Sequence, residues 1–300
     1  MNLVLVSFLS ACDEKKSKPT LEKPEIAKIT VYTVNYPLKY FTERIGGEFV
    51  DVQFPAPKDV DPAYWSPTAE IINSYQKADI ILLNGADYAK WIPKVSLPAS
   101  KMVNTNKNSE DEFIKVEGQA THTHGPEGAH THEDIAFTTW LDPTLAIAQA
   151  EVILQTLIAK TPTEKAFFEQ QFLELKKDLL SIDSEIAEII SNKPEMFVVF
   201  SHPVYQYFQK RYKIKGTSVH WEPNELPTAA MWHDFEHQKE HQKESALIWE
   251  GEPLKETVEK LQKTGIKSTV FSPCGNVPEK GDYMMVMLAN LENLQQVFRK

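Results

Sequence analysis

The sequence is poor in cysteine and carries no excess of positive charge. Its 300 residues include two cysteines, Cys12 and Cys274. Two thiols cannot supply a cysteine-rich zinc site, which needs three or four of them. The 32 basic and 42 acidic side chains give a formal net charge of −10. This balance argues against a nucleic-acid-binding protein, because such a protein needs a basic face to neutralise phosphates.

The N-terminal region has an apolar run that is too short to span a bilayer, at residues 3–9. No Lys or Arg precedes this run, whereas most export signals begin with basic residues. It leads into Leu9-Ser10-Ala11-Cys12, which resembles the processing box of bacterial lipoproteins, where the cysteine is lipidated. We therefore expect residues 1–27 to be a signal and a flexible tether. Lipidation of Cys12 would anchor the protein to a membrane, in the periplasm or at the cell surface, and would leave Cys274 without a disulfide partner.

Strand and helix patterns alternate from about residue 28 onwards. Residues 29–34 are rich in β-branched side chains, which favour a strand, and residues 80–83 form the short apolar run of a buried parallel strand. Further strands are expected at 49–54, 196–201, 218–221, 246–249 and 268–271, and helices at 37–45, 67–78, 203–212, 228–243, 254–264 and 282–298. This alternation predicts an α/β protein with mainly parallel sheets.

The longest helical pattern covers residues 161–193. Its apolar side chains recur at alternating spacings of four and three: Phe168, Phe172, Leu175, Leu179, Ile182, Ile186 and Ile189. Such a stripe predicts one helix of roughly 30 residues, about 45 Å long. We expect it to be a rigid linker between two α/β lobes, at 28–160 and 194–300. Parallel sheets bind ligands at the carboxyl ends of their strands, so the site should lie in the loops there.

A polar, histidine-rich loop interrupts the first lobe at residues 118–134. Its four histidines lie within eleven residues: His122, His124, His130 and His132. Short His-rich tracts are typical of metal-binding segments, and imidazole nitrogen suits zinc. The loop contains no Cys or Met, which favours zinc over Cu(I). The alternative is an exposed polar loop with incidental histidines.

Several candidate ligands follow strands of the second lobe. His202 comes at the end of the apolar strand 196–201, His220 lies near the end of the next predicted strand, 218–221, and Glu222 follows that strand. Glu250 follows the run that ends at Trp249, and a carboxylate near histidines can complete a tetrahedral zinc site. Each also has a structural interpretation, as a helix cap, a core residue or a surface charge.

Three further histidines recur every fourth residue in a polar helical segment: His233, His237 and His241. Many charged residues surround them, which favours a solvated helical face over a metal-binding stripe.

Five motifs, in order, together resemble the zinc- and manganese-binding receptors of ABC importers. They are Asp61-Pro62-Ala63-Tyr64-Trp65-Ser66-Pro67, Ala78-Asp79-Ile80 with Asn84-Gly85, Trp140-Leu141-Asp142-Pro143, Ser201-His202-Pro203-Val204-Tyr205, and Gly281-Asp282-Tyr283. The resemblance covers residues 28–298. It implies two α/β lobes joined by a linker helix, Zn²⁺ (or, less favoured, Mn²⁺) held between the lobes as cargo, and a membrane permease as partner.

The usual ligands of that family are mostly missing here. The resemblance places Ala63 and Thr138 where the family has histidines, and Ser272 where it has an acidic residue, whereas His202 matches a ligand position. Two arrangements follow. In the favoured one, loop histidines join His202 and a few neighbours in a rearranged cleft site: His220, Glu222, Glu250 and, as a soft ligand, Cys274. In the other, the cleft is degenerate and the loop alone binds metal.

The sequence therefore favours a monomeric, exported zinc receptor without catalytic activity. Two alternatives stay open. A zinc-dependent hydrolase is one, but the sequence has no His-Glu-x-x-His, no Gly-x-Ser-x-Gly and no glycine-rich phosphate loop. The other is a module for a non-metal ligand, in a cleft lined by aromatic side chains: Tyr64, Trp65, Trp140 and Trp221.

Overall fold

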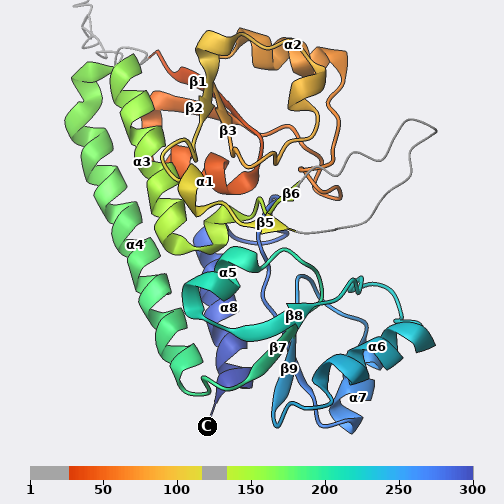
Figure 1. The fold of residues 1–300 in the computed structure, drawn as a ribbon. Helices are drawn as coiled ribbons and strands as arrows, with labels where there is room; N and C mark the ends of the chain where they lie inside the picture. Colours follow the sequence, from red (N-terminus) through yellow and green to blue (C-terminus); the bar gives the residue numbers. More distant parts are fainter. Residues whose placement is uncertain (1–26, 117–133, 300) are drawn as a thin grey trace, which may run out of the picture.

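The computed structural model describes residues 27–116 and 134–299. Within them the chain forms two lobes, each built on a four-stranded parallel sheet, with two long helices along one side (Figure 1). The predicted α/β class with two parallel-sheet lobes is confirmed. No helix in the described ranges is both long and apolar enough to cross a membrane.

The N-terminal lobe has the sheet order β2-β1-β3-β4. Its elements are β1 (Ile29–Thr33), α1 (Tyr36–Gly46), β2 (Val50–Gln53), α2 (Ala69–Lys77), β3 (Ile80–Leu83) and β4 (Met102–Asn104), followed by the antiparallel pair β5 (Lys115–Val116) and β6 (Asp134–Ile135). Asn35 starts α1, because its side chain accepts a hydrogen bond from the backbone N–H of Leu38 at 3.1 Å. Gly47, at φ 52°, ends α1 in a conformation that favours glycine.

The C-terminal lobe has the sheet order β10-β9-β7-β8. Its elements are β7 (Phe197–Phe200), α5 (Gln206–Tyr212), β8 (Lys215–Ser218), α6 (Ala229–Lys239), β9 (Ser245–Trp249), α7 (Lys255–Lys263), β10 (Lys267–Val270) and α8 (Tyr283–Phe298). Short 3-10 turns lie elsewhere, at Gly47–Phe49, Ile92–Lys94, Ala99–Lys101, Glu110–Glu112, Thr139–Leu141 and Pro162–Glu164.

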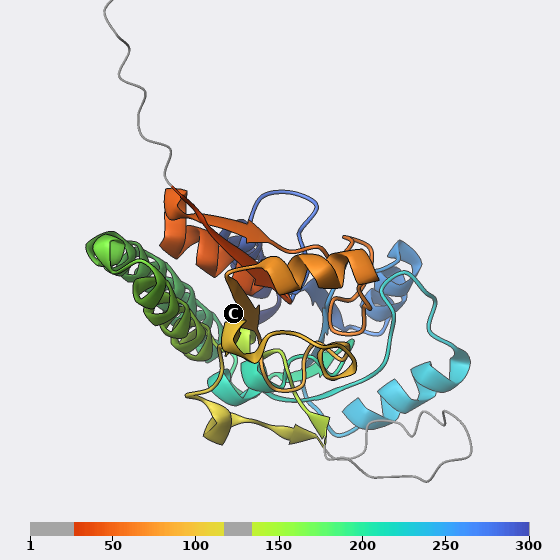
Figure 2. The ribbon, with the colours of Figure 1, turned by 90° about the horizontal axis from the view of Figure 1, so that it is seen from above.

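Helix α4 (Lys165–Ser191) runs along both lobes. All seven side chains of its predicted apolar stripe are buried. Two ion pairs tie it to the lobes: Arg44 of α1 contacts Asp178 at 2.9 Å, and Arg211 of α5 contacts Asp183 at 2.5 Å. Figure 2 shows α4 and its neighbour α3 at one edge of the molecule, with α6 at the opposite edge.

Several elements differ from the sequence-based expectation, and among them the short strands β4, β5 and β6 were not predicted. Helix α3 (Pro143–Lys160) was not predicted, because it is apolar around most of its circumference and so shows no single stripe. The strand expected at 218–221 lies three residues earlier in the structure, because β8 runs from Lys215 to Ser218. This edge strand is polar, and it contains Gly216 because a Cβ there would lie 2.0 Å from the carbonyl oxygen of Val198.

Candidate metal centre

The pairing of the strands in the C-terminal sheet places the loops after β7, β8 and β9 next to one another at the carboxyl edge of the sheet. Phe200, the last residue of β7, pairs with Ser218 of β8 and with Ile248 of β9. Two residues further along, His202 therefore faces His220 on one side and Glu250 on the other. Neighbouring strands lie about 4.8 Å apart, which is within the reach of these side chains. The carboxyl edge of this sheet thus gathers residues that are far apart in the sequence.

Buried Ser201 holds these loops together. Its carbonyl oxygen accepts a hydrogen bond from the backbone N–H of Trp221 at 2.8 Å, and its Oγ accepts one from the N–H of Glu250 at 3.2 Å. His202 and Glu222 directly follow Ser201 and Trp221 in the chain. These two hydrogen bonds therefore fix the backbone from which the three side chains of the cluster extend.

The imidazole of His202 lies between two carboxylates. Its Nε2 is 3.1 Å from Oε1 of Glu222, and its Nδ1 is 3.0 Å from Oε1 of Glu250. One ligand atom from each of these three residues lies within 4.8 Å of the others. Nδ1 is buried and makes no hydrogen bond of regular geometry within the described ranges. This cluster is the candidate metal site of the structure.

Negative charge surrounds this imidazole. Burial lowers the pKa of His202, but the carboxylates of Glu250 and Glu222 outweigh it, so the pKa is raised overall. Asp61, from the other lobe, is exposed as a residue, yet neighbouring atoms crowd its carboxyl. That desolvation, and the charge of Glu250, raise the pKa of Asp61 despite a hydrogen bond from the N–H of Ala63. A cation would relieve the repulsion among these carboxylates.

His220 is the next candidate ligand beside the cluster. It is exposed, and its ring lies 5.9 Å from that of His202 between centroids, at an interplanar angle of 85°. Together His202, His220 and Glu222 offer two imidazoles and one carboxylate, a donor set that zinc accepts. Nothing in the sequence shows which of the two carboxylates, Glu222 or Glu250, faces Nε2.

None of the three positions that the family resemblance marked holds a His, Cys, Asp or Glu: Ala63 and Thr138 lie on the N-terminal lobe, and Ser272 follows β10 of the C-terminal lobe. Ala63 is fully buried, and the Oγ1 of Thr138 donates a hydrogen bond to the carbonyl oxygen of Val204 at 2.5 Å. Ser272 accepts a hydrogen bond from the N–H of Cys274. Cys274 is not part of the cluster. It is buried, and burial together with Asp282 raises the pKa of its thiol to about 12.

The other predicted residues fall into three groups. The loop histidines and the predicted lipidation site lie outside the described residues: His122, His124, His130, His132 and Cys12. The histidines of the α6 segment, His233, His237 and His241, are exposed. Of the aromatic residues expected to line a cleft, Trp140 and Trp221 are instead buried in the core, so the aromatic-cleft alternative loses its support.

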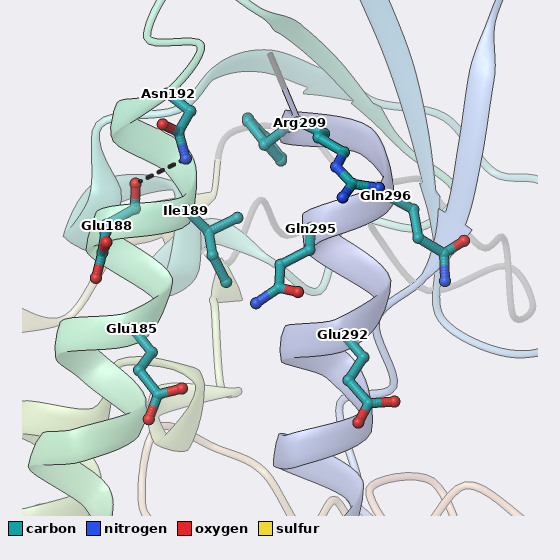
Figure 3. A pocket seen from close by; sticks show the side chains of 9 residues that line it. Glu185, Glu188, Ile189, Asn192, Glu292, Gln295, Gln296 and Arg299 are labelled. Atoms are coloured by element: carbon teal, nitrogen blue, oxygen red, sulfur yellow. Dashed lines mark hydrogen bonds between the residues drawn. The ribbon is translucent and has the colours of Figure 1, made fainter.

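One cavity of about 490 Å³ lies away from the cluster, between the C-terminal ends of α4 and α8 (Figure 3). Its lining includes Glu185, Glu188, Glu292 and Arg299. It contains no histidine or cysteine and has no counterpart among the sequence motifs. The His202 cluster is therefore the stronger candidate for the functional site.

Known proteins resemble this chain along most of its length. The "Zinc-binding lipoprotein AdcA" of Streptococcus pneumoniae strain R6 is 26% identical over 96% of the chain, but the match spans only 58% of AdcA. The "Manganese ABC transporter substrate-binding lipoprotein PsaA" of the same species is 28% identical over 74% of this chain and 70% of PsaA.

Solved structures share the fold. The Zn(II)-bound ZnuA-like domain of S. pneumoniae AdcA superposes with a TM-score of 0.76 at 23% identity, over 91% of this chain and 100% of that domain. The metal-dependent lipoprotein YcdH of Bacillus subtilis has a TM-score of 0.76 at 21% identity, over 90% of this chain and 99% of the other. The family described as "Zinc-uptake complex component A periplasmic" matches residues 31–297, so the chain belongs to this family, as its motifs predicted.

Proposed function

We propose that this protein captures zinc outside the cytoplasm and delivers it to an ABC permease, without catalysing a reaction. Zinc is the cargo, held at the His202 cluster. Lipidation of Cys12 anchors the protein to the membrane, where it acts as a monomer.

The three-residue cluster carries this proposal. His202, Glu222 and Glu250 place one imidazole and two carboxylates within reach of a single small cation. Nearby imidazole from His220 adds a second nitrogen donor. Mn²⁺ prefers oxygen ligands such as the two carboxylates, whereas imidazole suits zinc, so the imidazoles of His202 and His220 are the donors that support zinc as the cargo. One of the similar proteins is named for binding zinc and another for transporting manganese.

The cluster differs from a site shared by two lobes. All of its members belong to the C-terminal lobe. Ala63 and Thr138 of the N-terminal lobe offer no imidazole or carboxylate to a metal ion. The four loop histidines, His122 to His132, stay a prediction: they either complete the cleft site or bind metal separately.

Zinc titration of the full chain by calorimetry tests the proposal. We expect wild type to bind zinc with one tight site, and His202→Ala to weaken that site by more than about 100-fold, because a direct ligand contributes more than the 10–100-fold of an outer-shell partner. His233→Ala is the matched control, since this side chain is 82% exposed and outside the cluster.

A second variant separates the loop from the cleft. Replacing His122, His124, His130 and His132 by Gln removes the loop imidazoles but leaves the cluster intact. If zinc affinity were unchanged both in this variant and in His202→Ala, neither the loop histidines nor the His202 cluster would capture zinc. Tighter binding of Mn²⁺ than of Zn²⁺ by wild type would refute the cargo assignment.

A further inference from the structure

The exposed face of α6 carries histidines that do not belong to the His202 cluster. His233 and His237 both lie within α6, whereas His241 lies beyond its end at Lys239. Residues at positions i and i+4 of a helix are neighbours on one face, with Cβ atoms about 5–6 Å apart. His233 and His237 have this spacing, so the backbone of α6 places their imidazoles side by side.

Two aromatic side chains fix how α6 is turned against the lobe. Trp232 and Phe235 are buried, and their ring centroids lie 4.8 Å and 5.1 Å from that of Trp221. The helix lies at an edge of the molecule (Figure 2). The face opposite these aromatic rings, with His233 and His237, is therefore held towards solvent, and both histidines are exposed.

The two imidazoles are able to meet at one ion. The side chain of His233 is 82% exposed, and its Nδ1 lies 3.6 Å from Oδ1 of Asp234, which is too long for a hydrogen bond. The ring can therefore turn towards His237 without giving up that contact as a hydrogen bond. Two histidines at this spacing on one helix face hold zinc in the His-Glu-x-x-His motif of metalloproteases.

Carboxylates on the same face add negative charge beside the imidazoles. Glu236 and Glu240 follow His233 at i+3 and i+7, which places them on the face of the two histidines, and both are exposed. Lys239 pairs with Glu236 at 2.5 Å, so Glu240 is the carboxylate whose charge this lysine does not offset. A carboxylate oxygen is a further ligand that zinc accepts.

We propose that His233 and His237 form a second metal site on the outer face of α6, for a divalent transition ion that prefers imidazole, such as Zn²⁺, Ni²⁺ or Cu²⁺. Water completes the coordination shell of this exposed site. It has only two protein nitrogens, so it binds zinc more weakly than the three-residue His202 cluster. The site goes beyond the proposed function, because it uses no residue of that cluster.

Zinc titration of the full chain isolates the α6 site when His122, His124, His130 and His132 are replaced by Gln. In this loop variant we expect two binding events by calorimetry. Adding His233→Gln or His237→Gln should remove the weaker event and keep the tight one, whereas adding His202→Ala should remove the tight event and keep the weaker one. His241→Gln is the matched control, because this exposed imidazole lies beyond the end of α6 and its loss should leave both events unchanged.

A relocated imidazole tests the helical spacing. In His237→Gln combined with Gln238→His, the number of imidazoles is unchanged, but one of them is turned by about 100° around the helix. We expect this double change to remove the weaker event as well. Diethyl pyrocarbonate labelling followed by mass spectrometry gives the direct readout, since zinc should protect His233 and His237 from modification in wild type and in His202→Ala.

Four outcomes would overturn the α6 site. They are a single binding event in the loop variant, a weaker event that survives His233→Gln or His237→Gln, a weaker event that survives the relocation, and zinc that leaves both histidines open to modification. Absence of the tight event from wild type would instead overturn zinc capture at His202 and leave the α6 site standing.

Discussion

The carboxyl edges of the two sheets carry different chemistry on the same architecture. In the N-terminal lobe, Asn35, Asn84 and Asn106 follow β1, β3 and β4, and all three are buried. In the C-terminal lobe, His202 and Glu250 follow β7 and β9. One edge carries neutral amides, and the other carries groups that titrate.

Several hydrogen bonds between the amides meet at Asn84. Oδ1 of Asn84 accepts hydrogen bonds from Asn35 and Gln149, each at 3.1 Å, and its Nδ2 donates to the carbonyl oxygen of Phe137 at 2.9 Å. The C-terminal edge differs, because two carboxylates flank one imidazole, and the charge of Glu250 also acts on Asp61 of the other lobe. We therefore propose that the first edge stabilises the fold, whereas the second binds a cation.

The sharpest test makes the second edge resemble the first. His202→Asn replaces the imidazole by an amide, which is a poor zinc ligand. We expect a loss of zinc affinity of more than about 100-fold, since His202 supplies the one imidazole of the three-residue cluster. Calorimetric titration measures this loss, and circular dichroism checks the fold. If His202→Asn kept the zinc affinity of wild type, the imidazole at the C-terminal edge would not be needed for zinc binding.

Asn84→Ala tests the structural role of the first edge. It leaves the donors of Asn35 and Gln149 without their acceptor in a buried site, so we expect a loss of about 2–4 kcal/mol in the free energy of unfolding. Zinc affinity of the folded protein should stay within about twofold. Urea denaturation gives the first quantity. The control is exposed Asn108→Ala, and a comparable loss in the control would remove the distinction.

Thr138→Val tests whether the facing wall acts through packing. The change keeps the shape of the side chain but removes the hydroxyl that donates to the carbonyl oxygen of Val204. We expect the free energy of unfolding to fall by about 1 kcal/mol, with unchanged zinc affinity. Thr163→Val, at an exposed position, is the control. A marked change in zinc affinity would give this wall a direct part in binding.

The smallest effect is the pH dependence of stability in chelator-treated protein. The raised pKa of His202 in the folded state means that its protonation stabilises the fold below the unfolded-state pKa of about 6.5. This contribution is lost as the pH rises through the folded-state pKa. We expect the stability difference between wild type and His202→Gln to shrink by less than about 1 kcal/mol over that rise, measured by urea denaturation. If the stability difference between wild type and His202→Gln grew as the pH rises, protonation of His202 would not stabilise the fold.

Local pattern predicted the elements with a single apolar face or run. The stripe of α4 and the apolar strand before His202 are examples, because burial on one side leaves a periodic trace in the sequence. Helix α3 left no such trace, since it is enclosed by neighbours on several sides. The start of β8 was missed because an edge strand with Gly216 is polar and short.

The sequence by itself determined which kinds of side chain follow each strand and which family the chain belongs to. It therefore indicated His202, His220, Glu222 and Glu250 as candidates. The tertiary structure decided how they meet: the register of β8, β7 and β9 sets them at one level, and the strand order puts Glu222 and Glu250 at different nitrogens of His202. Register and strand order arise from packing between distant segments, which no local pattern contains.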